Sequence, residues 1–170
     1  MLIFYHIGVT LWETLVSFLF VISLSLALAL LLWSWKSFAD VAEPYLVALN
    51  SLPKSALAPL LIVWLGNNQK TIIVAAVSVA LFGSIMTLFT SFRQTDEEKI
   101  KLIYSLGGKR RHVLSKVLLP SSIPIIISNM KVNIGLCLVG VIIGEFLAAN
   151  AGLGYLIIYG QQTFRMDQVV

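Results

Sequence analysis

A glycine pair followed by a basic run is the stretch of this sequence whose residue types could bind phosphate. Residues 107–111 read Gly-Gly-Lys-Arg-Arg, so a glycine-lysine pair precedes two arginines. A nucleotide-binding loop of the G-x-x-x-x-G-K-[ST] type needs a second glycine five residues before the Gly-Lys pair and a hydroxyl after the lysine. Neither is present here, and the sequence therefore predicts that this chain holds no nucleotide-hydrolysing site.

Other side chains capable of catalysis are few. His6 and His112 lie far apart and offer no metal-ligand spacing, and the single cysteine, Cys137, excludes an internal disulfide. No Gly-x-Ser-x-Gly nucleophile elbow occurs. An enzyme acting within the membrane would need a nucleophile and a base at a suitable depth. We therefore expect no catalytic residue, no metal site and no cofactor.

Glu145 is an isolated carboxylate beside a long apolar run. An ionisable group next to a membrane span is a candidate functional residue, which here would line a transport pathway. The alternative is a solvated position at the outer interface. Asn133, a polar residue inside the preceding apolar run, is the second candidate for a pathway.

The composition favours a membrane protein. Of the 170 residues, 58% are hydrophobic and 12% are charged, and the mean hydropathy is +0.92. The charged share is about half that of a soluble domain, so the bilayer is the natural solvent. We expect an all-α polytopic bundle forming a single transmembrane domain over residues 1–170. The net charge of +4 then indicates topology rather than a nucleic-acid partner.

Four spans are expected, at about residues 10–35, 55–66, 71–92 and 122–144. The uncharged window 146–164 is a doubtful fifth, because it contains glycines, an asparagine and glutamines. The span at 55–66 is short, but 45–52 precedes it across Pro53, so a bend at Pro53 or Pro59 would give a broken helix. Residues 66–70, Gly-Asn-Asn-Gln-Lys, form a polar turn that makes the second and third spans a hairpin.

Basic residues indicate the orientation. Seven of the twelve Lys and Arg residues lie between positions 93 and 116: Arg93, Lys99, Lys101, Lys109, Arg110, Arg111 and Lys116. The positive-inside rule places this loop in the cytoplasm. Residues 36–54 then fall on the same side, and the segments 66–70 and 150–155 fall outside.

The basic loop has helical periodicity of its own. Apolar residues on both sides of the glycine pair predict two short amphipathic helices with a break at Gly107. Thr95 is the expected N-cap of the first helix, Pro120 is expected to stop the second, and Pro124 to lie in the first turn of the next span. Such a loop either lies flat among anionic headgroups or docks on a cytoplasmic partner.

Four segments, in order, resemble the binding-protein-dependent (type I) ABC importer permeases. The loop of that family has Glu-Ala-Ala, three residues, Gly, nine residues, Ile, one residue, and Leu-Pro. Here Gly107 is followed after nine residues by Val117 and then by Leu118-Leu119-Pro120, whereas Lys-Leu-Ile stands at 101–103 in place of Glu-Ala-Ala. The other segments are TLWETLVSF (10–18), LPKSALAPLLIVWLG (52–66) and GEFLAANAGLGYLI (144–157). These four segments are most similar to those of the branch of the family that transports nitrate, sulfonates, taurine and thiamine precursors.

The resemblance implies a transport subunit of the bacterial inner membrane that is not itself an enzyme. Its partners would be a pair of ATPase subunits, a second permease chain (a homodimer) and an extracytoplasmic solute-binding protein. The loop would carry the coupling residues, namely Ile100, Ile103, Tyr104, Ser105, Leu106, Gly107, Gly108, Lys109, Arg110, Arg111, Leu119 and Pro120. The substrate would be a small anion (sulfonate, taurine or nitrate) or a thiamine or pyrimidine precursor.

Family members usually have about six spans, so we expect one further span before Met1 and one after Val170. The alternatives to an ATP-driven permease are an ATP-independent channel or secondary carrier, and a membrane-anchored scaffold. Copurification of an ATPase subunit separates the first alternative from the permease.

Overall fold

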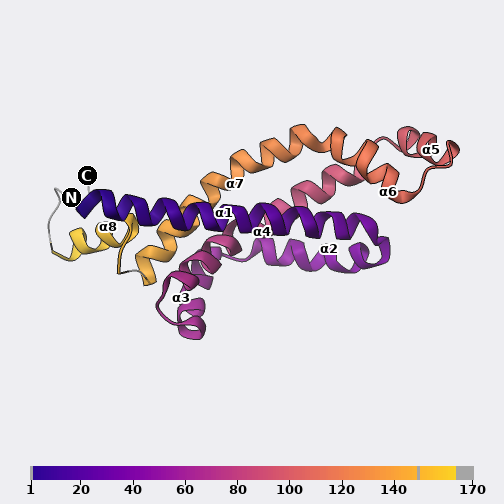
Figure 1. The fold of residues 1–170 in the computed structure, drawn as a ribbon. Helices are drawn as coiled ribbons and strands as arrows, with labels where there is room; N and C mark the ends of the chain where they lie inside the picture. Colours follow the sequence, from indigo (N-terminus) through magenta and orange to yellow (C-terminus); the bar gives the residue numbers. More distant parts are fainter. Residues whose placement is uncertain (1, 149, 164–170) are drawn as a thin grey trace.

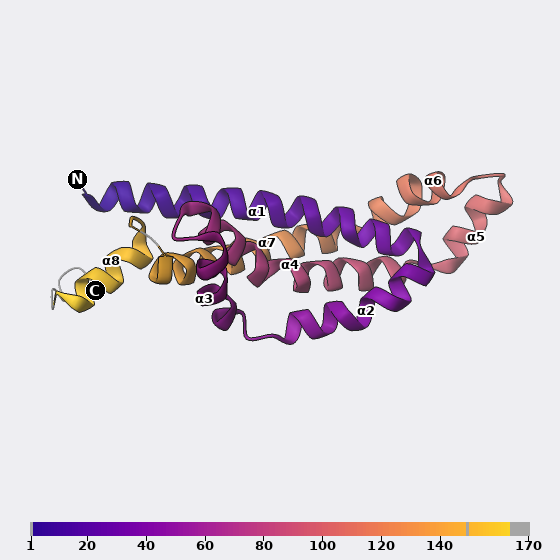
Figure 2. The same ribbon diagram turned by 90° about the horizontal axis from the view of Figure 1, so that it is seen from below.

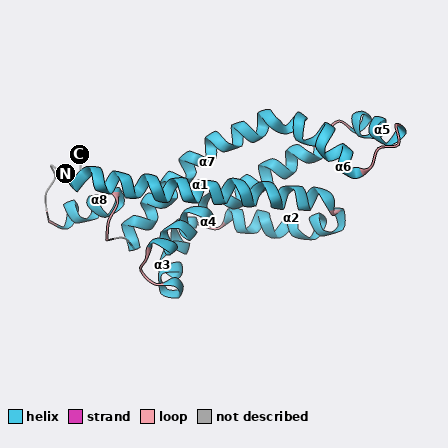
Figure 3. Ribbon diagram, viewed as in Figure 1, coloured by secondary structure: helices cyan, strands magenta, loops and turns pink. Residues whose placement is uncertain are grey.

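The computed structural model describes residues 2–148 and 150–163, and within these ranges the chain is helical without a strand (Figure 3). This confirms the all-α prediction. The elements are α1 (Leu2–Ser34), α2 (Lys36–Ser51), α3 (Lys54–Leu65), α4 (Gln69–Arg93), α5 (Glu97–Ser105), α6 (Arg110–Val113), the π-helical turn η1 (Leu114–Leu118), α7 (Leu119–Ala148) and α8 (Leu153–Gln162).

Three long helices form the body of the molecule. Helices α1, α4 and α7 pack side by side in an elongated bundle (Figures 1 and 2). Each belongs to a helix that is long and apolar enough to cross a membrane. This confirms the spans expected at about 10–35, 71–92 and 122–144.

The expected span at 55–66 corresponds to α3, whose 12 residues are too short to cross alone. Helices α2 and α3 pass the same test only as a pair, bent by 101°. The described residues therefore hold three candidate spans, or four if this bent pair counts as one span. The bend is at Pro53, as expected, whereas Pro59 lies inside α3. Leu52 has extended backbone (ψ 140°), the conformation that a following proline favours.

Helix α2 corrects the expected topology. We expected residues 36–54 to stay on the side of the basic loop, but only the start of α2 does so, and the helix then runs back along α1 and α4 (Figure 1). Ala39 of α2 is buried in a core cluster with Leu32 of α1 and Phe89 of α4. Apolar contact with the bundle therefore directs α2 away from the loop.

The doubtful fifth span is absent from the described residues. Helix α7 extends to Ala148, and α8 has only ten residues. Residue 164, where the expected window ended, lies outside the described residues.

Helices α4 and α7 approach closely at two glycines. A Cβ on Gly140 would lie 2.7 Å from the Ala76 Cα, and one on Gly144 would lie 3.0 Å from Ile72 Cγ2. No larger residue fits at Gly140 without moving a backbone. The glycines therefore permit the close packing of α4 against α7.

Candidate functional site

The basic loop projects from one end of the bundle as α5, α6 and η1 (Figure 1). Helix α5 begins one residue later than expected, because Asp96 rather than Thr95 is its N-cap. The Asp96 carboxylate accepts a hydrogen bond of 2.9 Å from the Glu98 N–H. Glu97 and Glu98 then lie at the positive end of the helix dipole.

The glycine break is a Schellman motif that ends α5. Gly107 has φ +76°, and its N–H donates to the Tyr104 carbonyl at 3.0 Å, while the Gly108 N–H donates to the Ile103 carbonyl at 2.8 Å. A Cβ on Gly108 would lie 2.5 Å from the Ile103 carbonyl oxygen. The two glycines therefore have different roles. Gly107 adopts the left-handed backbone conformation, and Gly108 allows the chain to pass close to the Ile103 carbonyl oxygen.

The predicted apolar face of the loop is partly exposed. Ile100 and Ile103 are half-buried, whereas Tyr104 is 49% and Leu106 75% exposed. Leu102, which was not among the predicted coupling residues, is also exposed, and its i, i+4 spacing from Leu106 could have identified it. The Ser105 hydroxyl donates to the Lys101 carbonyl within α5.

The basic run is divided between two roles. Arg110 turns back to the bundle, where its Nη2 donates to the Trp33 carbonyl oxygen at 2.8 Å and its guanidinium lies 5.1 Å from the Trp33 ring centre. Lys109 and Arg111 remain exposed, and the Lys109 N–H donates to His112 Nδ1 at the start of α6. Of the three basic residues predicted to take part in coupling, Arg110 therefore contacts α1 instead.

Pro120 does not stop the helix, contrary to the sequence prediction. A proline removes one N–H and its ring crowds the preceding turn. The wider turn η1 precedes Pro120, with the Leu119 N–H bonded to the Leu114 carbonyl five residues back, and the helix continues. Leu119 is half-buried and Pro120 exposed, and Pro124 lies inside α7 rather than in a first turn.

One continuous helix therefore joins the loop to the opposite end of the bundle. It runs from Arg110 to Ala148, 39 residues. At 1.5 Å per residue, this corresponds to about 58 Å. Glu145 lies near its far end.

Glu145 is buried rather than solvated at an interface, with 1% of its surface exposed. Its Oε1 accepts a hydrogen bond of 2.6 Å from the Thr10 hydroxyl, and its Oε2 accepts one of 2.8 Å from the Gly154 N–H. Next to it, the Gly152 N–H donates to His6 Nδ1 at 2.9 Å. The carboxylate therefore joins α1, α7 and the start of α8.

Gly152 is required at this junction. It has φ +112°, and a Cβ there would overlap the Glu145 carboxyl group. From the sequence, His6 was considered only as a metal ligand, and Thr10 and Glu13 only as part of the segment 10–18. Only the packing of α1 against α7 brings them to Glu145.

Asn133, the second candidate for a pathway, lies buried between α7 and α4. Its Nδ2 donates to the Ser84 hydroxyl oxygen at 3.0 Å, and Asn129 donates to the same oxygen at 2.7 Å. The arrangement holds the two helices together. Within the described part of the chain no group of three or more His, Cys, Asp or Glu side chains could hold a metal ion.

The sequence profile of a transporter family matches most of the chain. The family is described as the inner membrane component of binding-protein-dependent transport systems, and the match covers residues 20–170. The chain belongs to this family. The predicted resemblance is confirmed, and this permease is a multi-pass inner-membrane protein of a family that supplies a transport membrane component.

Similar curated permeases differ in the substrates that they are named for. The formylaminopyrimidine transport permease ThiX of Halalkalibacterium halodurans is 29% identical over 112 residues, covering 66% of this chain and 45% of that protein. The putative aliphatic sulfonates permease SsuC of Bacillus subtilis is 27% identical, covering 75% of this chain and 46% of that protein. The riboflavin permease RibX of Chloroflexus aurantiacus is 29% identical, covering 67% of this chain and 42% of that protein. The chain thus spans about half the length of these relatives.

The fold agrees with the family. A solved structure of the MetNI methionine ABC transporter in an inward-facing conformation matches 97% of this chain and 81% of its own chain, with a TM-score of 0.80 and 18% identity. This permease therefore has the type I ABC importer fold.

Proposed function

We propose that this chain is the transmembrane permease subunit of an ATP-driven importer, moved by a separate ATPase subunit that docks on the loop of residues 93–119. The observation that carries the proposal is the uninterrupted helix from Arg110 to Ala148. A continuous helix that begins in the loop and ends beside Glu145 connects a displacement of the loop to the opposite end of the bundle.

The loop surface has the composition of a docking site. Leu102, Tyr104 and Leu106 expose large apolar side chains, and the exposed Lys109 and Arg111 lie just beyond the glycine break. An apolar centre with a charged rim is typical of a protein interface. A partner groove with an apolar floor and acidic edges would complement it.

The assembly that we propose contains two such permease chains, a pair of ATPase subunits and an extracytoplasmic solute-binding protein within a lipid bilayer. The family description, which names binding-protein-dependent transport, supports the last component. The similarity of the fold to a chain of an ABC transporter supports the ATPase.

For the substrate we propose a small sulfonate, taurine or nitrate anion, or a thiamine or pyrimidine precursor. The names of two relatives, for formylaminopyrimidine and aliphatic sulfonates, support these classes, and a third is named for riboflavin. Competition binding on the cognate solute-binding protein, with one compound from each class, identifies the substrate.

Copurification of the ATPase subunit with the full-length permease tests the docking surface. Leu106→Ala should weaken ATPase binding by about tenfold or more, as for an apolar interface anchor. Val63→Ala is the matched control, since Val63 is 78% exposed on α3, away from the loop (Figure 1). Undiminished ATPase binding by Leu106→Ala contradicts the docking site. Absence of any ATPase from the wild-type preparation favours a channel or secondary carrier.

A further inference from the structure

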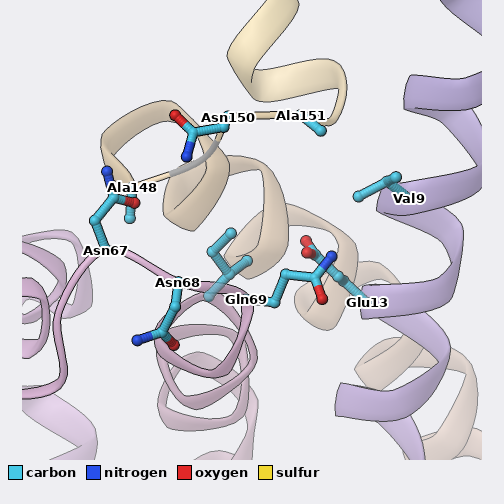
Figure 4. A pocket seen from close by; sticks show the side chains of 9 residues that line it. Val9, Glu13, Asn67, Asn68, Gln69, Ala148, Asn150 and Ala151 are labelled. Atoms are coloured by element: carbon cyan, nitrogen blue, oxygen red, sulfur yellow. The ribbon is translucent and has the colours of Figure 1, made fainter.

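A cavity of about 170 Å³ lies at the end of the bundle opposite the basic loop. It is lined by the two segments that the sequence analysis placed on the outer side, residues 67–69 and 150–151, together with α1 and the end of α7. Figure 4 shows Glu13 pointing into it from α1. The cavity belongs neither to the loop nor to the hydrogen bonds around Glu145.

Glu13 is a buried polar side chain in the lining of this cavity that has no hydrogen-bond partner among the described residues. The residue is 1% exposed, and neither of its carboxylate oxygens has a hydrogen-bond donor among the described residues. Burying a carboxylate without donors costs several kcal/mol, so a partner for it is expected. Glu145 contrasts with it, because Thr10 and Gly154 donate to its two oxygens.

Glu145 increases the negative charge at the cavity. Its carboxyl group lies close to the Glu13 carboxyl group, and two like charges so placed repel each other. The Nδ1 of His6 accepts the Gly152 N–H, so this atom is not a donor to Glu13. The ion pairs found in the described residues, Arg93–Glu43, Lys99–Asp96 and Lys101–Glu97, all lie towards the loop end.

The rim of the cavity is neutral and polar. Asn67, Gln69 and Asn150 are exposed at its mouth, whereas the Asn68 amide is occupied in capping α4 and bonding the Leu65 carbonyl. Amide oxygens accept hydrogen bonds from a cation. A water molecule takes about 30 Å³ in the liquid, so the volume suffices for a small ion with a few waters.

We propose that this cavity binds a small monovalent cation bearing N–H donors, an ammonium ion or a primary alkylammonium, with Glu13 as its counter-ion. The N–H groups satisfy the two free oxygens of Glu13, and the amide oxygens at the mouth complete the shell. The single positive charge offsets the negative charge of the Glu13 and Glu145 pair. The described residues offer no set of three acidic or imidazole ligands for a multivalent metal ion.

Thermal unfolding of the full-length protein with its partner subunits, in lipid nanodiscs at constant ionic strength, tests the site. Ammonium and methylammonium chloride should raise the Tm relative to tetramethylammonium chloride, which has no N–H, and relative to sodium chloride. Glu13→Gln should raise the apparent Kd for methylammonium by about thirtyfold or more, as for the loss of a buried charge partner. Glu43→Gln, which removes an exposed carboxylate at the loop end, should leave that Kd unchanged.

A second variant keeps the test decisive if Glu13→Gln fails to fold. Ala151→Leu fills the mouth and leaves Glu13 in place, and it should abolish the Tm response to methylammonium. Equal Tm values in all four salts would overturn the proposal. A methylammonium response that persists in Glu13→Gln, or an equal response to sodium, would also overturn it.

Discussion

The guanidinium of Arg110 lies 5.1 Å from the ring centre of Trp33 and donates a hydrogen bond of 2.8 Å to the Trp33 carbonyl oxygen. This contact joins the first residue of the helix that runs from the loop through the bundle to the last turn of α1. A displacement of the loop therefore acts on α1 as well as on α7. Because α1 and α7 also meet at Thr10 and Glu145, the two helices are linked near both ends.

Arg110→Lys should reduce the coupling of ATP hydrolysis to transport. Lysine keeps the charge but loses the planar group that stacks on Trp33 and hydrogen-bonds its carbonyl. Losing this contact costs about 1 kcal/mol. The stimulation of the ATPase by the loaded binding protein should therefore fall roughly fivefold. ATPase assays on reconstituted full-length complexes measure it, with Arg111→Lys as the control. Stimulation at the wild-type level in Arg110→Lys would show that the contact between Arg110 and Trp33 does not transmit motion of the loop to α1.

Gly107→Pro should abolish coupling without preventing membrane insertion. Proline fixes φ near −65°, whereas Gly107 has φ +76°, so the Schellman turn cannot form. Gly107→Asn is the matched variant, since asparagine tolerates the left-handed conformation and a Cβ at this position meets no atom within 4 Å. The ATPase assay combined with abundance in the membrane fraction checks both. Full coupling in Gly107→Pro would refute the role of the turn.

Gly140→Ala should destabilise the bundle, and Gly135→Ala should not. The methyl group at 140 would meet the backbone of Ala76, and such overpacking costs about 1–3 kcal/mol. The methyl group at 135 meets nothing within 4 Å, and alanine is the better helix former. Thermal unfolding in detergent compares the two variants. A Tm for Gly140→Ala equal to that of Gly135→Ala is incompatible with the close contact described.

Glu145→Gln should lower transport while assembly with the ATPase subunit stays normal. A carboxamide accepts from Thr10 through its oxygen but turns an N–H₂ group toward the Gly154 N–H, which then loses its acceptor. An unsatisfied buried donor costs about 1–3 kcal/mol. Uptake by proteoliposomes, together with copurification of the ATPase, measures both properties. Uptake at the wild-type level by the Glu145→Gln variant would show that transport does not depend on the Glu145 carboxylate.

The spans and the glycine break follow from local sequence, and this is why they could be predicted. Uncharged apolar windows identify α1, α4 and α7, and the basic residues around Gly107 identify the loop. The prediction that Pro120 stops the helix was wrong because a π-helical turn at residues 114–118 accommodates the proline. The residue types in that turn do not indicate a π-helix. The N-cap shifted from Thr95 to Asp96 because two adjacent residues were both suitable caps.

The site around Glu145 could only be half predicted. The carboxylate was noticed because it is isolated in an apolar region, but its hydrogen-bond partner Thr10 lies 135 residues away in the chain. Their contact depends on which faces of α1 and α7 meet. Glu13 flanks an apolar window in the sequence, and its burial appears only when α4 and residues 150–151 close over it.

Cross-linking from position 106 tests the central claim, that the loop docks on an ATPase subunit. The one native cysteine, Cys137, is buried, so Leu106→Cys introduces an accessible thiol at an exposed position. With a short thiol-to-amine cross-linker, the full-length Leu106→Cys permease should become joined to the ATPase subunit, whereas the Val63→Cys permease should not. Equal yields from both positions, or no product with the ATPase from Leu106→Cys, would contradict the account.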